Sequence, residues 1–246
     1  MIELKRAKEN PILSPNRDIV WGSEAVFNPG AGGTIYLFDI NSSTTTFIGG
    51  GTQPRIDGDN VVYQKFPSPR DIYLYNISTG QTTLISTNGD SWPYISGNDI
   101  VYQGGNTLYH YGLNSEIETV LVSTTVPFRG SLSGGIVAYD ERRDGLGGQD
   151  HDAYVYTLST GIEKRLTSQS GGELGNISIS GNRVVWTDTD DYNLYLYDLT
   201  TEQLTQLTSD PSQQYHSYID GNRIVWADGR DSGSGTTDHN IYLLEL

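Results

Sequence analysis

The sequence predicts an all-β protein in which one four-stranded unit is repeated six times, and three observations lead to this prediction. One order of residues recurs, in which an apolar residue, Ser or Asp, and Gly precede two β-branched residues and an aromatic, and an apolar–Tyr–apolar stretch follows later. The tyrosines of that stretch lie 37, 36, 45, 41 and 47 residues apart, at Tyr36, Tyr73, Tyr109, Tyr154, Tyr195 and Tyr242. The 17 Tyr and 29 Gly among 246 residues favour short strands and tight turns. A period of about 40 residues is typical of a propeller blade, so the predicted fold class is a six-bladed β-propeller that forms one domain over residues 1–246.

Within each repeat the four strands are expected in chain order, from the innermost to the outermost. In the third copy, residues 93–96 would form the innermost strand and 98–103 the second. In the fifth copy, the alternating stretch 194–199 would form the third strand and 203–207 the outer fourth. Gly-Asn and Thr-Gly pairs mark the tight turns between strands. The six copies span 11–43, 54–80, 93–116, 131–161, 177–202 and 218–246.

The two ends of the chain are expected to meet in one blade. The last copy stops after its third strand, at "NIYLLEL", and residues 2–7 resemble the outer strand predicted at 162–167. We therefore predict that residues 2–7 form the fourth strand of the last blade, which would leave no unpaired sheet edge where the ends meet.

Composition excludes several classes of partner. The chain carries 30 Asp and Glu against 15 Lys and Arg, and its formal charge of -15 would repel nucleic acid and anionic membrane surfaces. No apolar run approaches the roughly 20 residues of a membrane span, and the first residues lack the apolar core of a signal peptide. The absence of Cys removes disulfides, thiolate metal sites and thiol nucleophiles. We expect a monomer without membrane insertion, whose charge is compatible with cations, neutral ligands or basic proteins.

Six residues at the entry of the innermost strands occupy equivalent places in the repeat and are the predicted ligand-binding residues. In a propeller these places surround the mouth of the central channel. Amides, a guanidinium, an imidazole and an indole together could stack on a sugar or a peptide and hydrogen-bond to it. The residues are Asn10, Gln53, Trp92, Arg129, Asn176 and His216.

Acidic residues gather in the long loops that follow two second strands, at 140–152 and 228–240, and in a third stretch at 188–193. One interpretation is structural, because Asp-x-Arg pairs such as Asp228 with Arg230, or Asp140 with Arg142, would brace long hairpins. The other interpretation is a calcium site, since hard cations bind carboxylate and amide oxygens. The candidate metal ligands are Asp140, Asp150, Asp152, Asp188, Asp190, Asp228 and Asp238.

The histidines and the large aromatics have simpler interpretations. His110 lies within a predicted third strand and is expected to be a packed or hydrogen-bonded sheet residue. The aromatics of the second strands are expected to form the core and to pack one blade on the next, at Tyr63, Tyr102, Tyr139, Trp186 and Trp226. An enzymatic function would require a catalytic group, such as a transition metal held by His151, His216 and His239. The sequence contains no Gly-x-Ser-x-Gly motif that would support a serine nucleophile.

Stretches such as "ISGNRVVW" (179–186) and "NLYLYDLTTE" (193–202) resemble the TolB-type propeller repeats of periplasmic TolB proteins and of bacterial and archaeal cell-surface proteins. The resemblance covers nearly the whole chain and implies a TolB-like propeller in the periplasm or outside the cell. Proteins with such blades include adaptors, surface modules, and propeller domains of peptidases and sugar-acid lyases. We therefore predict a non-enzymatic binding or scaffold propeller that recognises a protein or a glycan through its long-loop face and channel mouth. The alternative is a metal-dependent lyase or hydrolase that acts on acidic glycans.

Overall fold

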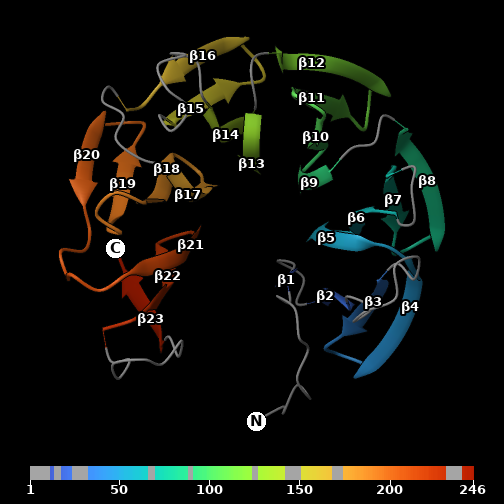
Figure 1. The fold of residues 1–246 in the computed structure, drawn as a ribbon. Coiled ribbons are helices and arrows are strands. Elements are labelled where there is room, and N and C mark those ends of the chain that lie inside the picture. Colours follow the sequence, from blue (N-terminus) through green and yellow to red (C-terminus); the bar gives the residue numbers. More distant parts are fainter. Residues whose placement is uncertain are drawn as a thin grey trace. The chain divides into compact units, whose positions relative to one another are not determined.

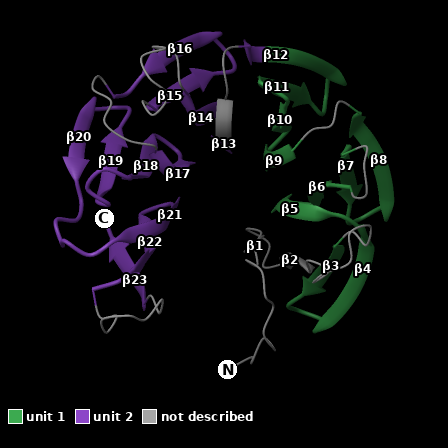
Figure 2. Cartoon of the chain, in the orientation of Figure 1, with its two compact units in different colours: residues 1–120 green, residues 121–246 purple. Residues whose placement is uncertain are grey.

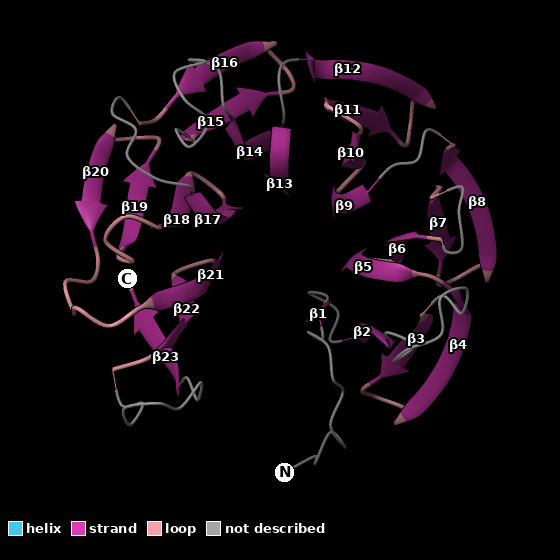
Figure 3. Ribbon diagram, in the orientation of Figure 1, coloured by secondary structure: helices cyan, strands magenta, loops and turns pink. Residues whose placement is uncertain are grey.

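The computed structural model describes residues 12–13, 18–23, 33–65, 70–87, 91–123, 127–141, 151–167, 174–230 and 240–246, and at 12–13, 18–23 and 127–129 the backbone alone. In these ranges every regular element is a β-strand, which confirms the all-β prediction (Figure 3). The same ranges contain no helix long and apolar enough to cross a membrane. The chain divides into two compact units, Met1–Val120 and Leu121–Leu246, and each unit is described by itself (Figure 2).

Unit 1 contains three sheets in which each strand is hydrogen-bonded to the next one along the chain (Figure 1). The first sheet consists of β1 (Ile12–Leu13), β2 (Asp18–Ser23), β3 (Thr34–Asp39) and β4 (Thr44–Gly50). The second consists of β5 (Thr52–Asp57), β6 (Asn60–Gln64), β7 (Ile72–Asn76) and β8 (Gln81–Ser86). The third consists of β9 (Ser91–Ser96), β10 (Asp99–Gly104), β11 (Thr107–Gly112) and β12 (Ile117–Ser123), and the last residues of β12 belong to the sequence range of unit 2.

Unit 2 repeats the same connection of strands. Its first sheet consists of β13 (Pro127–Ser133), β14 (Ile136–Glu141), β15 (Asp152–Thr157) and β16 (Ile162–Arg165). Its second consists of β17 (Leu174–Ser180), β18 (Arg183–Asp188), β19 (Leu194–Asp198) and β20 (Gln203–Gln206). Its third has three strands within the described residues, β21 (Gln214–Asp220), β22 (Arg223–Asp228) and β23 (Asn240–Glu245). Residues 2–7, predicted as the fourth strand of this sheet, lie outside the described residues.

The order of the strands agrees with the order predicted from the repeat. The predicted second strand at 98–103 is β10, and the predicted third and fourth strands at 194–199 and 203–207 are β19 and β20. Second strands such as β6 are almost entirely buried, whereas all residues of β20 are exposed. A sheet that is buried at its second strand and exposed at its fourth is consistent with a propeller-like fold.

Each second strand whose side chains the structure describes places a large aromatic ring opposite the tyrosine of the third strand. The rings stack with centroids from 5.7 Å to 6.3 Å apart, in the pairs Tyr63–Tyr73, Tyr102–Tyr109, Tyr139–Tyr154, Trp186–Tyr195 and Trp226–Tyr242. The second-strand member of every pair is buried, which confirms the prediction that these aromatics are core residues. Within a unit they also pack against the preceding sheet, as Trp186 does in a cluster with Ala138 and Val155. Stacking across the strands of one sheet adds to this burial and was not predicted.

The recurring Ser/Asp-Gly pair connects neighbouring sheets within a unit. Each Gly opens the tight turn after a first strand with a positive φ, a conformation that glycine adopts without strain. In three of the copies its N–H donates to the Ser or Asp side chain at the same turn of the preceding sheet. The bonds join Gly97 to Asp57 Oδ2 (2.6 Å), Gly181 to Ser133 Oγ (3.0 Å) and Gly221 to Ser180 Oγ (2.9 Å). In these copies the motif accepts a hydrogen bond from the next copy along the chain, which gives a physical reason for its recurrence.

Candidate ligand-binding site

The first strand of several sheets contains a β-bulge close to its start. In β5 the pairing with β6 shifts register between Thr52 and Arg55, so that two residues lie opposite Tyr63. The corresponding shift occurs in β9, β13, β17 and β21. Bulges redirect side chains and are frequent beside functional sites. The predicted ligand-binding residues within the described ranges all lie in these bulges.

Four of the predicted ligand-binding residues have a left-handed backbone. Their φ angles are 54° at Gln53, 55° at Trp92, 44° at Asn176 and 53° at His216. A left-handed conformation costs a residue other than glycine roughly 1–2 kcal/mol. Arg129 lies in the bulge of β13, which is opposite Asp140 and not opposite the second-strand aromatic, and the structure describes only its backbone there. Asn10 lies outside the described residues. Equivalent positions in the repeat thus carry the same strained backbone.

In unit 1, Gln53 and Trp92 occupy the bulges of adjacent sheets and contact each other. The backbone N–H of Trp92 donates to Gln53 Oε1 at 2.8 Å. Both residues are half-buried. The structure thus brings together two of the predicted ligand-binding residues, which are 39 positions apart in the chain.

In unit 2, Asn176 and His216 form the corresponding pair. Asn176 Nδ2 lies 3.0 Å from His216 Nδ1. Since an amide nitrogen only donates, Nδ1 is the acceptor and the neutral imidazole carries its proton on Nε2. The ring of His216 is next to that of Tyr215, with centroids 6.3 Å apart, and Tyr215 contacts Tyr192 with centroids 5.7 Å apart. Sequence reasoning missed both tyrosines, because they lie outside the aligned repeat position.

His216→Gly is expected to have a free energy of unfolding up to about 1 kcal/mol higher than that of His216→Ala. Glycine removes the left-handed strain, and this gain exceeds its larger loss of backbone entropy on folding. His216→Ala is the matched control, because alanine keeps the strain and loses the same side-chain contacts. Urea unfolding of both variants measures the difference, and a His216→Gly protein less stable than His216→Ala would contradict the strain argument.

The acidic residues of the β13–β16 sheet are bound by neighbouring side chains. Asp140 Oδ2 lies 2.9 Å from His151 Nδ1, and both side chains are 2% exposed. Asp152 Oδ2 lies 2.5 Å from Arg165 Nη2, and Thr167 Oγ1 donates to Asp152 Oδ1 at 2.6 Å. These contacts agree with a bracing role, and His151 is one partner of Asp140. The predicted pair of Asp140 with Arg142 stays a prediction, because Arg142 lies outside the described residues.

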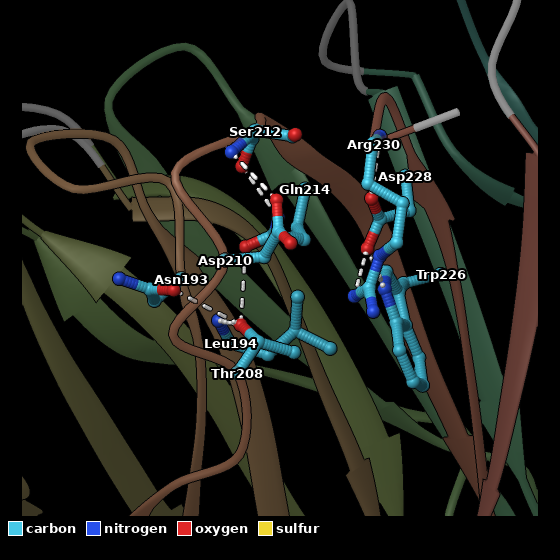
Figure 4. A network of polar contacts seen from close by, with 9 residues as sticks. All are labelled: Asn193, Leu194, Thr208, Asp210, Ser212, Gln214, Trp226, Asp228 and Arg230. Atoms are coloured by element: carbon cyan, nitrogen blue, oxygen red, sulfur yellow. Dashed lines mark hydrogen bonds and ion pairs between the residues drawn. The ribbon is translucent and has the colours of Figure 1, made fainter. Parts of the chain in front are cut away.

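Asp228 is the most buried of the candidate metal ligands that the structure describes, and the predicted pair with Arg230 is present (Figure 4). The side chain of Asp228 is fully buried, and its Oδ2 accepts bonds from Arg230 Nη2 (2.6 Å) and Trp226 Nε1 (3.0 Å). Oδ1 accepts the backbone N–H of Arg230 at 2.9 Å. Burial raises the pKa of Asp228, but the bonds from Arg230 and Trp226 outweigh it and hold the pKa below its usual value. The guanidinium of Arg230 also lies over the ring of Tyr242, 4.5 Å from the centroid.

Asp140 and Asp228 each begin an acidic loop in the sequence, but they occupy different positions in the strand pairing of their sheets. Asp140 is paired with Ala153, one position before the last pair of its ladder, whereas Asp228 is paired with Asn240 at the end of its own. The residue equivalent to Asp228 is therefore Glu141. Because side chains alternate between the faces of a strand, this offset of one residue places Asp140 and Asp228 on opposite faces of their sheets.

A second polar network in unit 2 was not predicted from the sequence (Figure 4). Thr208 Oγ1 accepts the backbone N–H of Leu194 at 2.9 Å and lies 3.2 Å from Asn193 Oδ1 and 3.1 Å from Gln214 Oε1. The hydroxyl of Thr208 has one proton, so at any one time it donates either to Asn193 Oδ1 or to Gln214 Oε1. Gln214 is fully buried and donates through Nε2 to the carbonyl of Ser212. The network anchors the start of β21 to the preceding sheet.

Thr167 holds the β13–β16 sheet in the same way as Thr208 holds its own. Its Oγ1 accepts the backbone N–H of Ala153 at 3.1 Å and donates to Asp152. Asp152 and Asn193 are equivalent, because each lies two positions before the third-strand tyrosine. A Leu-Thr-Ser triplet follows the outer strand at 166–168 and 207–209, and this triplet is the signal by which the threonines could have been found.

The acidic turn after β18 is organised by its own carboxylates. Asp188 Oδ1 accepts the backbone N–H of Asp190 at 2.9 Å. Asp191 accepts the backbone N–H of Asn193 at 2.9 Å and the hydroxyl of Tyr195 at 2.7 Å. Burial raises the pKa of Asp188, and the negative charges of Asp191 and Asp190 add to the rise. Burial and the bond to Asp191 raise the pKa of Tyr195 to about 12.

Asp188→Asn is expected to stabilise the protein at pH 7, by less than about 1 kcal/mol because Asp188 is half-buried and solvent screens its charge. The folded pKa is raised, so the penalty of ionising Asp188 appears as pH rises through the unfolded value near 3.8 and persists above the folded pKa. Asparagine keeps Oδ1 as acceptor for Asp190. Thermal unfolding at pH 7 and pH 3 should show a higher Tm for the variant at pH 7 only, and a variant less stable than the parent at pH 7 would refute this.

The described residues do not bring the candidate metal ligands together. Within the described ranges, no group of three or more His, Cys, Asp or Glu side chains is arranged to hold a metal ion. Asp150, Asp238 and His239 lie outside those ranges, so calcium binding in the loops stays a prediction. His110, by contrast, has the predicted role of a sheet residue, since Nε2 bonds Asp99 Oδ1 at 2.8 Å and Nδ1 lies 3.3 Å from Thr119 Oγ1.

Comparison with known proteins bears on the fold. No family model and no curated protein sequence matches the chain. Among solved structures, the acylaminoacyl peptidase of Pyrococcus horikoshii is similar with a TM-score of 0.72 and 14% identity over 96% of this chain and 44% of that chain. TolB from Acinetobacter baumannii is similar with a TM-score of 0.56 and 16% identity over 98% of this chain and 72% of that chain. An oligogalacturonate lyase in complex with manganese is similar with a TM-score of 0.59 and 13% identity over 95% of this chain and 72% of that chain.

These similarities concern the fold and not the activity. The chain spans less than half the length of the peptidase, and proteins with one fold carry unrelated functions. The strand order, the burial of the second strands and the three solved structures agree with one another. The chain has a TolB-like, propeller-like β fold.

Proposed function

We propose that the chain is a non-enzymatic binding module that recognises a protein or carbohydrate partner through the bulge residues of its first strands and its long loops. The observation that carries the proposal is the left-handed backbone of Gln53, Trp92, Asn176 and His216 in equivalent bulges. The periplasm or the cell surface is the location that the TolB-like fold favours for such a module.

Strained backbone of this kind is retained where the side chain is needed. A bulge whose first residue is left-handed is most easily built with glycine. This chain uses amide, indole and imidazole side chains instead, which hydrogen-bond and stack. Non-glycine residues held in a left-handed conformation are frequent in ligand-binding sites. Contact with a ligand is the function that explains these side chains best.

The test uses a double variant, Trp92→Gly with His216→Gly, because glycine removes both side chains without straining the backbone. Labelled full chain is applied to a peptide array and a glycan array. We expect ligands of the parent to bind the double variant at least 10-fold more weakly. Thr83→Ala, at an exposed position of β8, is the matched control and should bind like the parent.

The proposal fails on either of two outcomes. One is a parent chain that binds nothing on either array. The other is a double variant that binds every ligand of the parent with unchanged affinity.

One comparison favours a second candidate function, a metal-dependent lyase or hydrolase that acts on acidic glycans. A protein of the same fold is an oligogalacturonate lyase in complex with manganese. In this chain His151 is 3% exposed and engaged with Asp140, so it would have to leave that contact to bind a metal together with His216 and His239. Elemental analysis and an oligogalacturonate assay by ultraviolet absorbance test this candidate. A stoichiometric transition metal with turnover would replace the binding module by an enzyme.

The proposal also includes calcium bound by the acidic loops and a closed six-bladed form of the fold, with residues 2–7 as the fourth strand of the last sheet. Asp150 lies in the loop that ends at Asp152, and Asp238 lies in the loop that begins at Asp228, so each loop would supply its own calcium ligands. A calcium titration followed by thermal unfolding tests the site, because a ligand of the folded state raises Tm with its concentration. An unchanged Tm up to millimolar calcium would exclude a calcium site.

A further inference from the structure

Unit 2 contains a continuous group of aromatic and polar side chains made of Tyr192, Tyr215, His216 and Asn176. The rings of Tyr192 and Tyr215 are 5.7 Å apart with an interplanar angle of 71°, and those of Tyr215 and His216 are 6.3 Å apart at 43°. Asn176 Nδ2 donates to His216 Nδ1 at 3.0 Å. His216 is exposed and the other three are half-buried. The group therefore combines ring faces with hydrogen-bonding groups.

The backbone holds this group in place before any ligand binds. The carbonyl of Tyr192 accepts the backbone N–H of Gln214 at 3.2 Å, and Gln214 is itself fully buried and bonded to Thr208. Tyr192 and His216 both have a left-handed backbone, with φ of 56° and 53°. The hydroxyl of Tyr215 donates to Gln213. A group that is fixed in advance loses little conformational entropy on binding.

Charge restricts the ligand that this group accepts. Asp190 and Asp191 directly precede Tyr192, and Asp191 is bonded to the hydroxyl of Tyr195. The whole chain has a formal charge of -15. Carboxylated or sulfated glycans would be repelled by this field, whereas an uncharged ligand would not.

We propose that Tyr192, Tyr215, His216 and Asn176 form a subsite for an uncharged oligosaccharide. The C–H face of a pyranose ring stacks on a tyrosine ring, and imidazole and amide groups hydrogen-bond to its hydroxyls. The inference rests on the proposed binding function and narrows its partner to a neutral glycan. It also opposes the acidic glycans of the second candidate function.

Isothermal titration calorimetry of the full chain tests the proposal with neutral hexaoses of glucose, mannose and N-acetylglucosamine, and with hexagalacturonate as the acidic comparator. The parent should bind at least one neutral hexaose and bind hexagalacturonate more weakly. Tyr215→Ala should lower the affinity for the neutral hexaose at least 10-fold. Tyr215→Phe keeps the ring and should stay within about 3-fold.

Three results would overturn the proposal: no neutral hexaose bound by the parent, preference for hexagalacturonate, or unchanged affinity in Tyr215→Ala. Thermal unfolding verifies that each variant is folded. Tyr192→Gly is a second variant, because glycine adopts the left-handed backbone without strain, and its affinity for the neutral hexaose should also fall at least 10-fold. If no neutral hexaose binds but a peptide is bound and lost in the Trp92→Gly, His216→Gly variant, the glycan inference fails and the binding module stands. If the parent binds neither sugar nor peptide, both fail.

Discussion

Trp186→Ala is expected to lower the free energy of unfolding by about 3–5 kcal/mol. The indole is 2% exposed and stacks on Tyr195 with centroids 6.3 Å apart. It shares a buried cluster with Ala138 and Val155 of the preceding sheet. The hydrogen-bonded strands on both sides cannot collapse into the space that alanine leaves, so a cavity adds to the lost burial. Urea unfolding followed by circular dichroism measures the loss.

Two further substitutions separate the cavity from a general effect of mutation. Trp186→Phe keeps a ring against Tyr195 and should lose about half as much. Leu204→Ala removes a side chain that is 51% exposed on β20 and should change stability by less than about 1 kcal/mol. A loss below about 1 kcal/mol in Trp186→Ala would show that the aromatic pairs do not stabilise the sheets.

Asp228→Ala is expected to cost about 2–4 kcal/mol at pH 7. The substitution leaves the Nε1 donor of Trp226 without its acceptor and removes the charge that faces Arg230. Arg230 is 33% exposed, so water compensates part of the loss at the guanidinium. Chemical denaturation at pH 7 measures the effect. Asp210→Ala is the control, because its carboxylate accepts the backbone N–H of Ser212, two positions later in a local turn, and a smaller loss is expected there.

The contribution of Asp228 depends on pH in a defined direction. Its folded pKa lies below the unfolded value near 3.8, so the stabilisation is present above that value and is lost as pH falls through the folded pKa. Asp228→Asn keeps one acceptor oxygen and removes the charge. The difference in unfolding free energy between the parent and Asp228→Asn should be constant from pH 5 to 7 and shrink below pH 4. A difference that grows as pH falls would contradict the lowered pKa.

Much of the candidate site could be located from the sequence, because its residues occupy one repeated position. Aligning the copies on Tyr63 or Trp226 is sufficient to place Gln53 and His216 at the entry of a first strand. The left-handed backbone at that entry could not be predicted, since none of these residues is a glycine. It arises from the register shift against the second strand, which is a property of the pairing.

The partners of the acidic residues could be predicted only in part. Arg230 was found because it lies two positions after Asp228, within reach of a local turn. His151 and Thr167 were not assigned to Asp140 and Asp152, because these contacts cross from one strand to another. The Leu-Thr-Ser triplet marks the position of Thr167 in the sequence. Its hydrogen bond to the backbone of Ala153 could not be predicted, because that contact depends on where the end of the outer strand lies against the third strand.

The sequence by itself determined the all-β class, the order of the strands in each sheet and the positions of the core aromatics, because each follows from alternation and turn chemistry within about 40 residues. Only the tertiary structure decided which side chains meet: the edge-to-face contact of Tyr192 with Tyr215, the pairing of Asn176 with His216, and the opposite faces of Asp140 and Asp228. The physical reason is strand register. A shift of one residue turns a side chain to the other face, and register is set by long-range pairing that no local pattern encodes.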